Sequence, residues 1–128
     1  MIHWCSRFIG IPYAQMNCAV LVAHVLESEF LRPDIGAALR GFPEHSMGTR
    51  ERSHAISQGW RELAEKVDVP QDGDGVILKI GSKLSHMGLA VDTPKGLYVL
   101  HTVGDRGSVI EPFGKMMTCK VEGFYRWK

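Results

Sequence analysis

One cysteine and two histidines are the residues of this chain whose types and spacing could form a catalytic centre. Cys18 follows Asn17, a good helix N-cap, and opens an apolar run that is typical of a helix. A helix N-terminus carries partial positive charge, which lowers the pKa of a thiol and favours the nucleophilic thiolate. His86 could then act as base and His101 could hold the His86 ring in the useful tautomer. This pattern predicts a cysteine hydrolase, with the backbone N–H of Cys18 contributing to an oxyanion hole.

The same three residues also have a purely structural interpretation. A cysteine on an apolar helix is usually an inert core residue. A histidine on a strand is more often a half-exposed surface group than a catalyst. Because thiol plus histidine is a loose pattern that many folds satisfy by accident, spacing alone does not decide between the two interpretations.

Length and composition indicate one ordinary globular domain spanning residues 1–128. With 15 Lys+Arg against 14 Asp+Glu, the net charge of +1 gives no strong field for nucleic acid or anionic membranes. Three cysteines without a C-x-x-C pair argue against a disulfide framework and a structural zinc site, so we expect no metal and no cofactor. No apolar run is long enough to insert in a membrane, and the N-terminal residues do not resemble a secretory signal.

Hydrophobic periodicity predicts helices first and strands second. A buried central helix is expected at 18–30, short helices at 6–11 and around 35–40, and a longer one at about 49–64. Five strands separated by Gly- and Pro-containing turns are expected at 76–80, 86–92, 97–102, 108–111 and 121–127. The expected fold is therefore α+β, with N-terminal helices packed on an antiparallel sheet or half-barrel of five to six strands, arranged as a meander.

Four short segments surround the candidate residues in a characteristic order. They are Gly10-Ile11-Pro12-Tyr13, Asn17-Cys18-Ala19-Val20-Leu21-Val22, Gly73-Asp74 and His86-Met87-Gly88-Leu89. They resemble the Gly-x-Pro-Tyr, Asp-Cys-x-Gly-Leu-Val, Gly-Asp and His-Val-Gly-Ile segments of the NlpC-type cell-wall cysteine peptidases, a papain-like group with a circularly permuted core. The resemblance extends from about Arg7 to Val109.

This resemblance implies a role for each candidate residue. Cys18 is expected to be the nucleophile, His86 the base and His101 the orienting residue. Tyr13 is expected near the oxyanion, and Asn17 and Ser85, which flank the nucleophile and the base, are further candidates for oxyanion or substrate contacts. The expected substrate is a peptide bond in a peptidoglycan stem peptide, cleaved through an acyl group on the cysteine.

The chain departs from the family pattern close to the nucleophile. Asn17 stands where the family usually has Asp, Ala19 where Ser is frequent and Val20 where Gly is usual. The Trp-Gly-Gly segment between the tyrosine and the cysteine is absent. Since the residues beside the nucleophile line the substrate cleft in the family, the exact bond cleaved does not carry over.

The short length and the segment Glu122–Trp127 look most like the branch of the family found in bacteriophage tail proteins. That resemblance implies a tail-tip component that opens the cell wall, with other tail proteins as partners. The expected location is the virion tail, or the host cytoplasm during assembly. Two alternatives remain open: a structural tail-assembly module with little or no catalysis, and an acyltransferase or thioesterase on the same fold.

Overall fold

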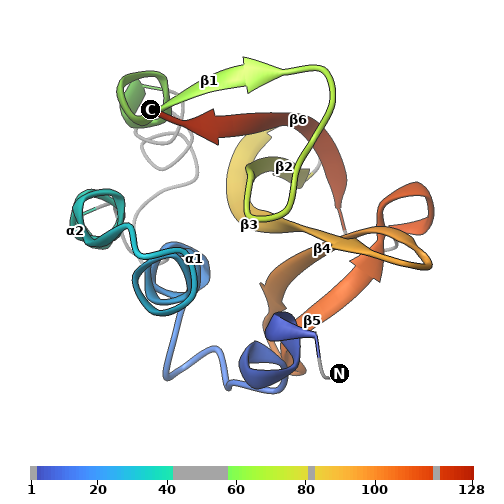
Figure 1. Ribbon diagram of the computed structural model, residues 1–128. Helices are drawn as coiled ribbons and strands as arrows, with labels where there is room; N and C mark the ends of the chain where they lie inside the picture. The colour runs from blue at the N-terminus through green and yellow to red at the C-terminus, as the bar shows by residue number, and fades with distance from the viewer. Residues whose placement is uncertain (1–2, 42–57, 81–82, 117–118) are drawn as a thin grey trace.

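The computed structural model describes residues 3–41, 58–80, 83–116 and 119–128, with the backbone alone at 80 and 83–85. Helical elements precede most of the strands along the described chain (Figure 1). The labelled elements are η1 (Trp4–Phe8), α1 (Cys18–Ser28), α2 (Pro33–Arg40), β1 (Ala64–Val67), β2 (Gly75–Ile80), β3 (Lys83–Thr93), β4 (Gly96–Val103), β5 (Gly107–Pro112), η2 (Phe113–Lys115) and β6 (Lys120–Trp127). Residues 58–63 are also helical.

The central helix begins at the expected residue and ends slightly earlier than expected. The side-chain oxygen of Asn17 accepts a hydrogen bond from the backbone N–H of Val20 at 3.0 Å, as expected for an N-cap. At the other end, Leu31 adopts a left-handed backbone with φ 55°, and the N–H of Arg32 donates to the carbonyl of Leu26 at 2.9 Å. This turn ends α1 at Ser28 and leads directly into α2.

The remaining helix predictions are correct in kind but shifted. The expected short helix at 6–11 is instead a 3₁₀ helix at Trp4–Phe8, because Gly10 and Ile11 form backbone hydrogen bonds with Ser108 of β5. Helix α2 starts two residues before 35, with Pro33 in the first turn, where proline is well tolerated. In the helix expected at 49–64, residues 58–63 are helical, and 49–57 lie outside the described part.

The structure forms one six-stranded antiparallel sheet, open rather than closed, so the α+β prediction is confirmed. The strand order is β1-β6-β2-β3-β4-β5. Strands β2 to β5 form the expected meander, but β6 returns to lie between β1 and β2, so the expectation of a simple meander is wrong for the last strand. Strand β1 is not among the expected strands: Ala64, placed in a helix by its sequence, pairs with Trp127.

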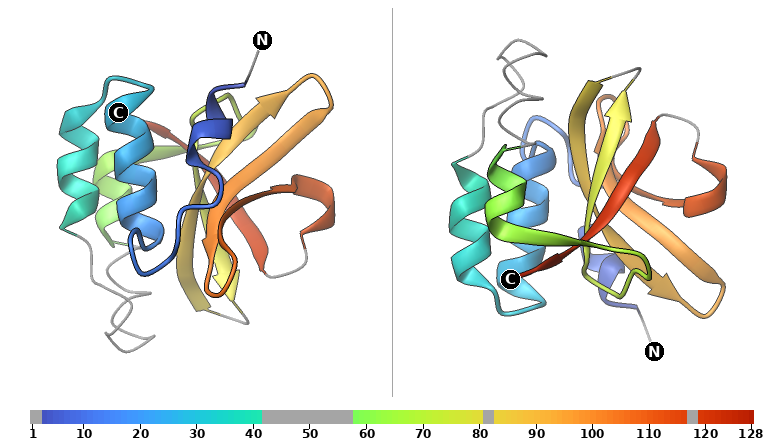
Figure 2. Two further views of the ribbon diagram at one scale, coloured as in Figure 1. Left: turned by 90° about the horizontal axis from the view of Figure 1, so that it is seen from below. Right: turned by 90° about the horizontal axis from the view of Figure 1, so that it is seen from above.

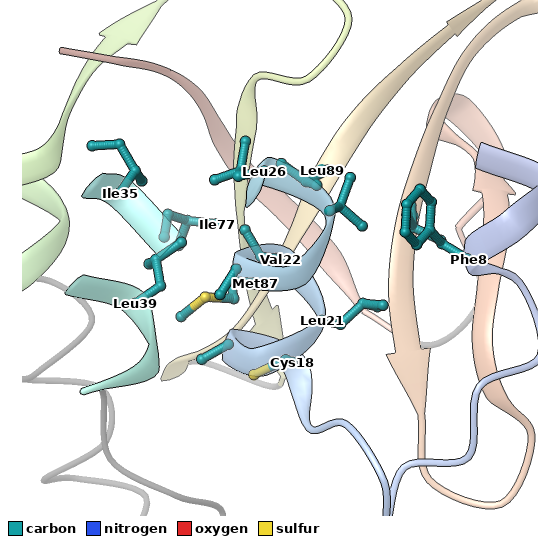
Figure 3. Packing of buried hydrophobic residues seen from close by; sticks show 14 of the residues in the cluster. Phe8, Cys18, Leu21, Val22, Leu26, Ile35, Leu39, Ile77, Met87 and Leu89 are labelled. Carbon is teal, nitrogen blue, oxygen red and sulfur yellow. The ribbon is translucent and has the colours of Figure 1, made fainter. Parts of the chain in front are cut away.

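Helix α1 packs against β3 and β4 on one face of the twisted sheet, and α2 packs beside α1, farther from these strands (Figure 2). The larger hydrophobic cluster joins the helices to the sheet and includes Leu21 and Leu26 of α1 and Met87 and Leu89 of β3 (Figure 3). A second cluster lies on the opposite face of the sheet, and its buried residues are Val76, Leu78, Ala90, Val99 and Phe124. Among the described residues, no helix has the length and apolar character needed to cross a membrane.

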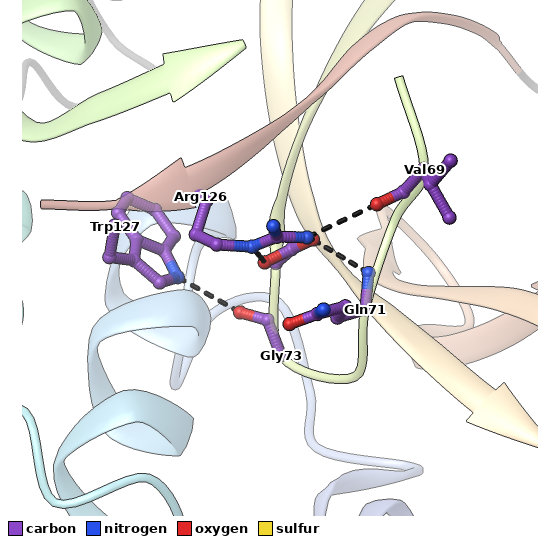
Figure 4. A network of polar contacts seen from close by, with 6 residues as sticks. Val69, Gln71, Gly73, Arg126 and Trp127 are labelled. Atoms are coloured by element: carbon purple, nitrogen blue, oxygen red, sulfur yellow. Dashed lines mark hydrogen bonds and ion pairs between the residues drawn. The ribbon is translucent and has the colours of Figure 1, made fainter. Parts of the chain in front are cut away.

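The Gly-Asp segment before β2 has a structural role in this fold. The buried carboxylate of Asp74 accepts hydrogen bonds from the backbone N–H of Gln71 at 2.7 Å and from the guanidinium of Arg126 at 2.9 Å. Arg126 also donates to the carbonyl of Val69, and the Trp127 indole donates to the carbonyl of Gly73 (Figure 4). These bonds attach the loop before β2 to the end of β6.

Candidate active site

Cys18 is the first residue of α1, the helix that packs against β3 and β4. Figure 3 shows Cys18 at the start of this helix, with Met87 beside its first turns and Leu89 near the turn that carries Leu26. Because Met87 and Leu89 face α1, His86 and Gly88, which alternate with them along β3, lie on the opposite face of the sheet, with Leu78 and Val76. The side chain of Cys18 is completely buried.

The two candidate histidines are brought together on neighbouring strands. Nε2 of His86 in β3 lies 3.0 Å from Nδ1 of His101 in β4, which is hydrogen-bond distance. The rings meet edge to face with their centroids 5.2 Å apart. Only 8% of His86 and 1% of His101 is exposed, so neither is the half-exposed surface histidine that the structural interpretation favours.

Gly88 explains why the two rings can meet. Continuing the β3–β4 register by one residue brings Gly88 opposite His101. A methyl group at Gly88 would lie 2.5 Å from the carbonyl oxygen of Leu100 and 3.1 Å from Cβ of His101. The close approach of β3 and β4 beside the histidines therefore requires glycine in the His-x-Gly segment.

The pairing of β2 with β3 is irregular immediately before His86. Leu78 pairs with His86 but the next residue, Lys79, pairs with Leu84, so one residue of β3 is left over between them. Such bulges redirect side chains and are frequent beside active sites. The left-over residue is Ser85, whose side chain lies outside the described residues.

Glu111 is a further member of the site that sequence reasoning missed. Its Oε1 lies 2.7 Å from Nε2 of His101, and Glu111 is 9% exposed. In the β4–β5 hairpin His101 pairs with Val109, so Glu111, two residues along, lies on the same face as a diagonal neighbour. A signal for this contact exists in the sequence, because a turn at 104–106 sets this register.

Burial determines the charge of His101. Removal from water lowers its pKa below the usual value, and the Glu111 contact opposes this effect without reversing it. The positive charge of Arg106 acts in the same direction as burial. His101 is therefore neutral near pH 7 and carries a single ring proton.

Ser108 anchors the segment that carries Tyr13. The Ser108 hydroxyl donates to the carbonyl of Phe8 and accepts from the N–H of Ile11 at 2.8 Å, and its backbone bonds to Gly10 and Ile11 as well. The neighbouring Gly107, with φ 74°, leaves room for the Ile11 carbonyl. The hydroxyl of Tyr13 is buried.

The turn after Tyr13 connects this segment to the nucleophile. The carbonyl of Pro12 accepts from the N–H groups of Gln15 and Met16 at 3.0 and 3.1 Å, and Asn17 follows as the cap of α1. Because Ser108 and Pro12 hold both ends of this short stretch, Tyr13 is positioned by contacts on each side of it.

No family model, curated protein or solved structure matches this chain. Within the described residues, no group of three or more His, Cys, Asp or Glu side chains converges as a metal site. The candidate site is thus a chain of hydrogen-bonded side chains, His86–His101–Glu111, on the sheet face that also carries Leu78 and Val99, whereas Cys18 starts the helix that packs on the opposite face. Such a chain can hold an imidazole in a defined tautomer for proton transfer.

Proposed function

We propose that this protein is a cysteine hydrolase of the NlpC type, with Cys18 as nucleophile, His86 as base and His101 as orienting residue. The observation that carries the proposal is the buried hydrogen bond between His86 and His101. A buried imidazole pair is costly unless its hydrogen bonds are satisfied, and here His101 is bonded on both sides, to His86 and to Glu111. The order of Cys18, His86 and His101 along the chain is also that of the catalytic residues in the family that the sequence resembles.

In the proposed mechanism, His86 removes the proton of the Cys18 thiol and the thiolate attacks the carbonyl carbon of the scissile amide. The negative oxygen that forms accepts hydrogen bonds from the backbone N–H of Cys18 and from the Tyr13 hydroxyl. His86 then gives its proton to the leaving amine, and the C–N bond breaks to leave a thioester on Cys18. Water, deprotonated by His86, attacks the thioester and regenerates the thiol.

The resemblance supplies the proposed substrate and setting. We infer that the scissile bond belongs to a peptidoglycan stem peptide and that the protein acts at the cell wall as a tail-tip component of a bacteriophage. The nearly neutral overall charge is compatible with a substrate that is neither nucleic acid nor membrane.

The experiment compares release of stem-peptide fragments from purified cell walls by the wild-type protein, Cys18→Ala and Cys119→Ala. Cys119 is a half-buried cysteine that, like Cys18, is outside any disulfide, so it serves as the control. We expect Cys18→Ala to abolish release and Cys119→Ala to retain it. Release that is unchanged in Cys18→Ala would refute the proposal.

Complete burial of Cys18 favours a second candidate, a structural tail-assembly module that keeps the fold with little or no hydrolysis. For catalysis, a rearrangement must first expose the thiol to substrate and bring it to His86, which lies on the opposite face of the sheet. Association with tail proteins that persists in Cys18→Ala, together with no thiolate at neutral pH, supports the module. An acyl group trapped on Cys18 and detected by mass spectrometry argues against the module, since hydrolysis and acyl transfer both pass through it, and transfer to an acceptor other than water then identifies an acyltransferase.

A further inference from the structure

We propose that Glu111 is a positioning residue that sets where the ring protons of His101 and His86 lie, and thereby keeps Nδ1 of His86 unprotonated and able to accept the thiol proton. This inference rests on the proposed function of Cys18 and His86. It adds to the nucleophile, base and orienting residue a fourth group, located on the far side of His101.

The carboxylate of Glu111 determines which ring nitrogen of His101 carries the proton. An ionised carboxylate can only accept hydrogen bonds. Because Oε1 of Glu111 lies 2.7 Å from Nε2 of His101, that nitrogen must carry the proton. His101 is neutral, so its other nitrogen, Nδ1, has no proton and acts as an acceptor.

The tautomer of His101 in turn determines which ring nitrogen of His86 carries the proton. Nδ1 of His101 lies 3.0 Å from Nε2 of His86. Because Nδ1 of His101 accepts this hydrogen bond, Nε2 of His86 must carry the proton that is donated. A neutral His86 with its proton on Nε2 has an unprotonated Nδ1. That atom is the one able to take a proton from a thiol.

Glu111 also favours the charged state that follows. When Nδ1 of His86 takes up a proton, the imidazolium keeps its Nε2–H bond to His101, and the negative charge of Glu111 lies one ring away. In a buried site this attraction is only weakly screened. The other charged side chain that acts on His101 in the described part of the chain is Arg106, whose positive charge opposes it.

Without the carboxylate, the proton order is no longer determined. An amide at position 111 offers both a donor and an acceptor, so His101 can also carry its proton on Nδ1. In that tautomer His101 donates to Nε2 of His86, and the His86 proton moves to Nδ1. The nitrogen that should act as base is then occupied.

The first test reads the tautomers directly and needs no substrate. Nitrogen-15 NMR of the histidine rings is recorded for the wild-type protein, Glu111→Gln, Glu111→Asp and Glu122→Gln. Glu122 is a matched control, since its carboxylate also accepts bonds within the sheet, from Lys66 and Tyr125. We expect Nε2–H forms of both His86 and His101 in the wild type, in Glu111→Asp and in Glu122→Gln, and a mixture that includes Nδ1–H forms in Glu111→Gln.

A His101 protonated at Nδ1 in the wild type would overturn the inference, and so would tautomers that are unchanged in Glu111→Gln. These outcomes are independent of the cell-wall assay. The proposed function fails if Cys18→Ala retains activity, whereas the proton order fails on the ring spectra whatever the cell-wall assay shows, so the two failures are distinguishable.

The second test measures kcat and KM across pH with whichever substrate the wild-type protein cleaves. We expect Glu111→Gln to lower kcat by about 10- to 100-fold, the range found when a carboxylate that orients a metal-bound imidazole is removed, with little change in KM. The alkaline limb of the profile moves to lower pH because the imidazolium is less stabilised, and Glu111→Asp restores it in part. A loss of activity with unmoved limbs would indicate a merely structural role and contradict the inference.

Discussion

Nε2 of His86 and Nδ1 of His101 lie 3.0 Å apart on adjacent strands, although fifteen positions separate the two residues along the chain. Both side chains are almost completely buried, and the second ring bonds onward to Glu111 at 2.7 Å. A buried polar chain of this kind is stable only when each member has its partner. The site therefore depends on the exact approach of β3, β4 and β5, which the following predictions test.

Replacing Gly88 should separate the two histidines. Gly88→Ala introduces a methyl group 2.5 Å from the Leu100 carbonyl, so β4 must move away from β3. We expect a loss of about 1–3 kcal/mol in the free energy of unfolding, as for other overpacked sites, together with loss of the His86–His101 bond in ring NMR spectra. Gly104→Ala is the control, because nothing lies within 4 Å of the added methyl group there; equal stability of the two variants would contradict this account.

Stability should decrease in acid because of His101. Burial lowers its pKa in the folded protein, whereas the unfolded chain takes up a proton as the pH falls below about 6.5. The unfolded state then binds more protons than the folded state. The contribution of His101 to the free energy of unfolding is therefore complete above that pH and is lost as the pH falls toward the lowered pKa of the folded state. Denaturant titrations at several pH values should show a shallower decrease for His101→Asn, and identical slopes would argue against this assignment.

Cys18 and Cys5 should differ in reactivity even though they are almost equally inaccessible. Exposure is 0% and 3%, respectively, so reagent reaches each thiol only through local opening, and the effect of His86→Ala separates chemistry from access. Burial, with a smaller effect of Asp72, raises the pKa of Cys5 and keeps it a thiol at neutral pH. We expect iodoacetamide at pH 7, followed by peptide mapping, to label Cys18 first, and His86→Ala to remove that preference; equal rates for the two thiols in the wild type would count against a thiolate at Cys18.

The Ser108 hydroxyl should be needed for stability, in contrast to the hydroxyl directly across from it. Ser108→Ala leaves the Phe8 carbonyl and the Ile11 N–H without their side-chain partner, which should cost about 1–3 kcal/mol and loosen the segment before Tyr13. Thr102 pairs with Ser108 in the β4–β5 ladder, and its buried hydroxyl has no partner among the described residues. Thr102→Val should therefore be neutral or stabilising, and thermal unfolding of both variants provides the comparison; a larger loss for Thr102→Val would reverse the argument.

The Asp74 carboxylate should stabilise the fold without contributing to chemistry. Asp74→Asn weakens the bonds to Arg126 and to the Gln71 N–H, so the loop before β2 detaches more easily from β6. We expect a lower melting temperature with an unchanged preference for alkylation of Cys18. Loss of that preference at a temperature where the variant is folded would show that the network extends to the site.

Local sequence patterns determine most elements of this protein. The Asn17 cap, the apolar run after Cys18 and the glycine-punctuated strands are properties of neighbouring residues, so the amino-acid sequence by itself is enough to locate α1 and β2 to β6. The three candidate side chains Cys18, His86 and His101 are recognisable for the same reason, since each lies in a short segment with a characteristic pattern.

Tertiary structure alone decides which strands pair and which side chains meet. Strand β1 lacks a strand pattern of its own and exists because Trp127 and its neighbours in β6 pair with it. The sequence leaves open whether the histidines are surface groups or a buried pair, and the tight β3–β4 approach at Gly88 decides this. Glu111 joins the site through the register of the β4–β5 hairpin, because a contact across strands depends on pairing that residue type alone does not specify.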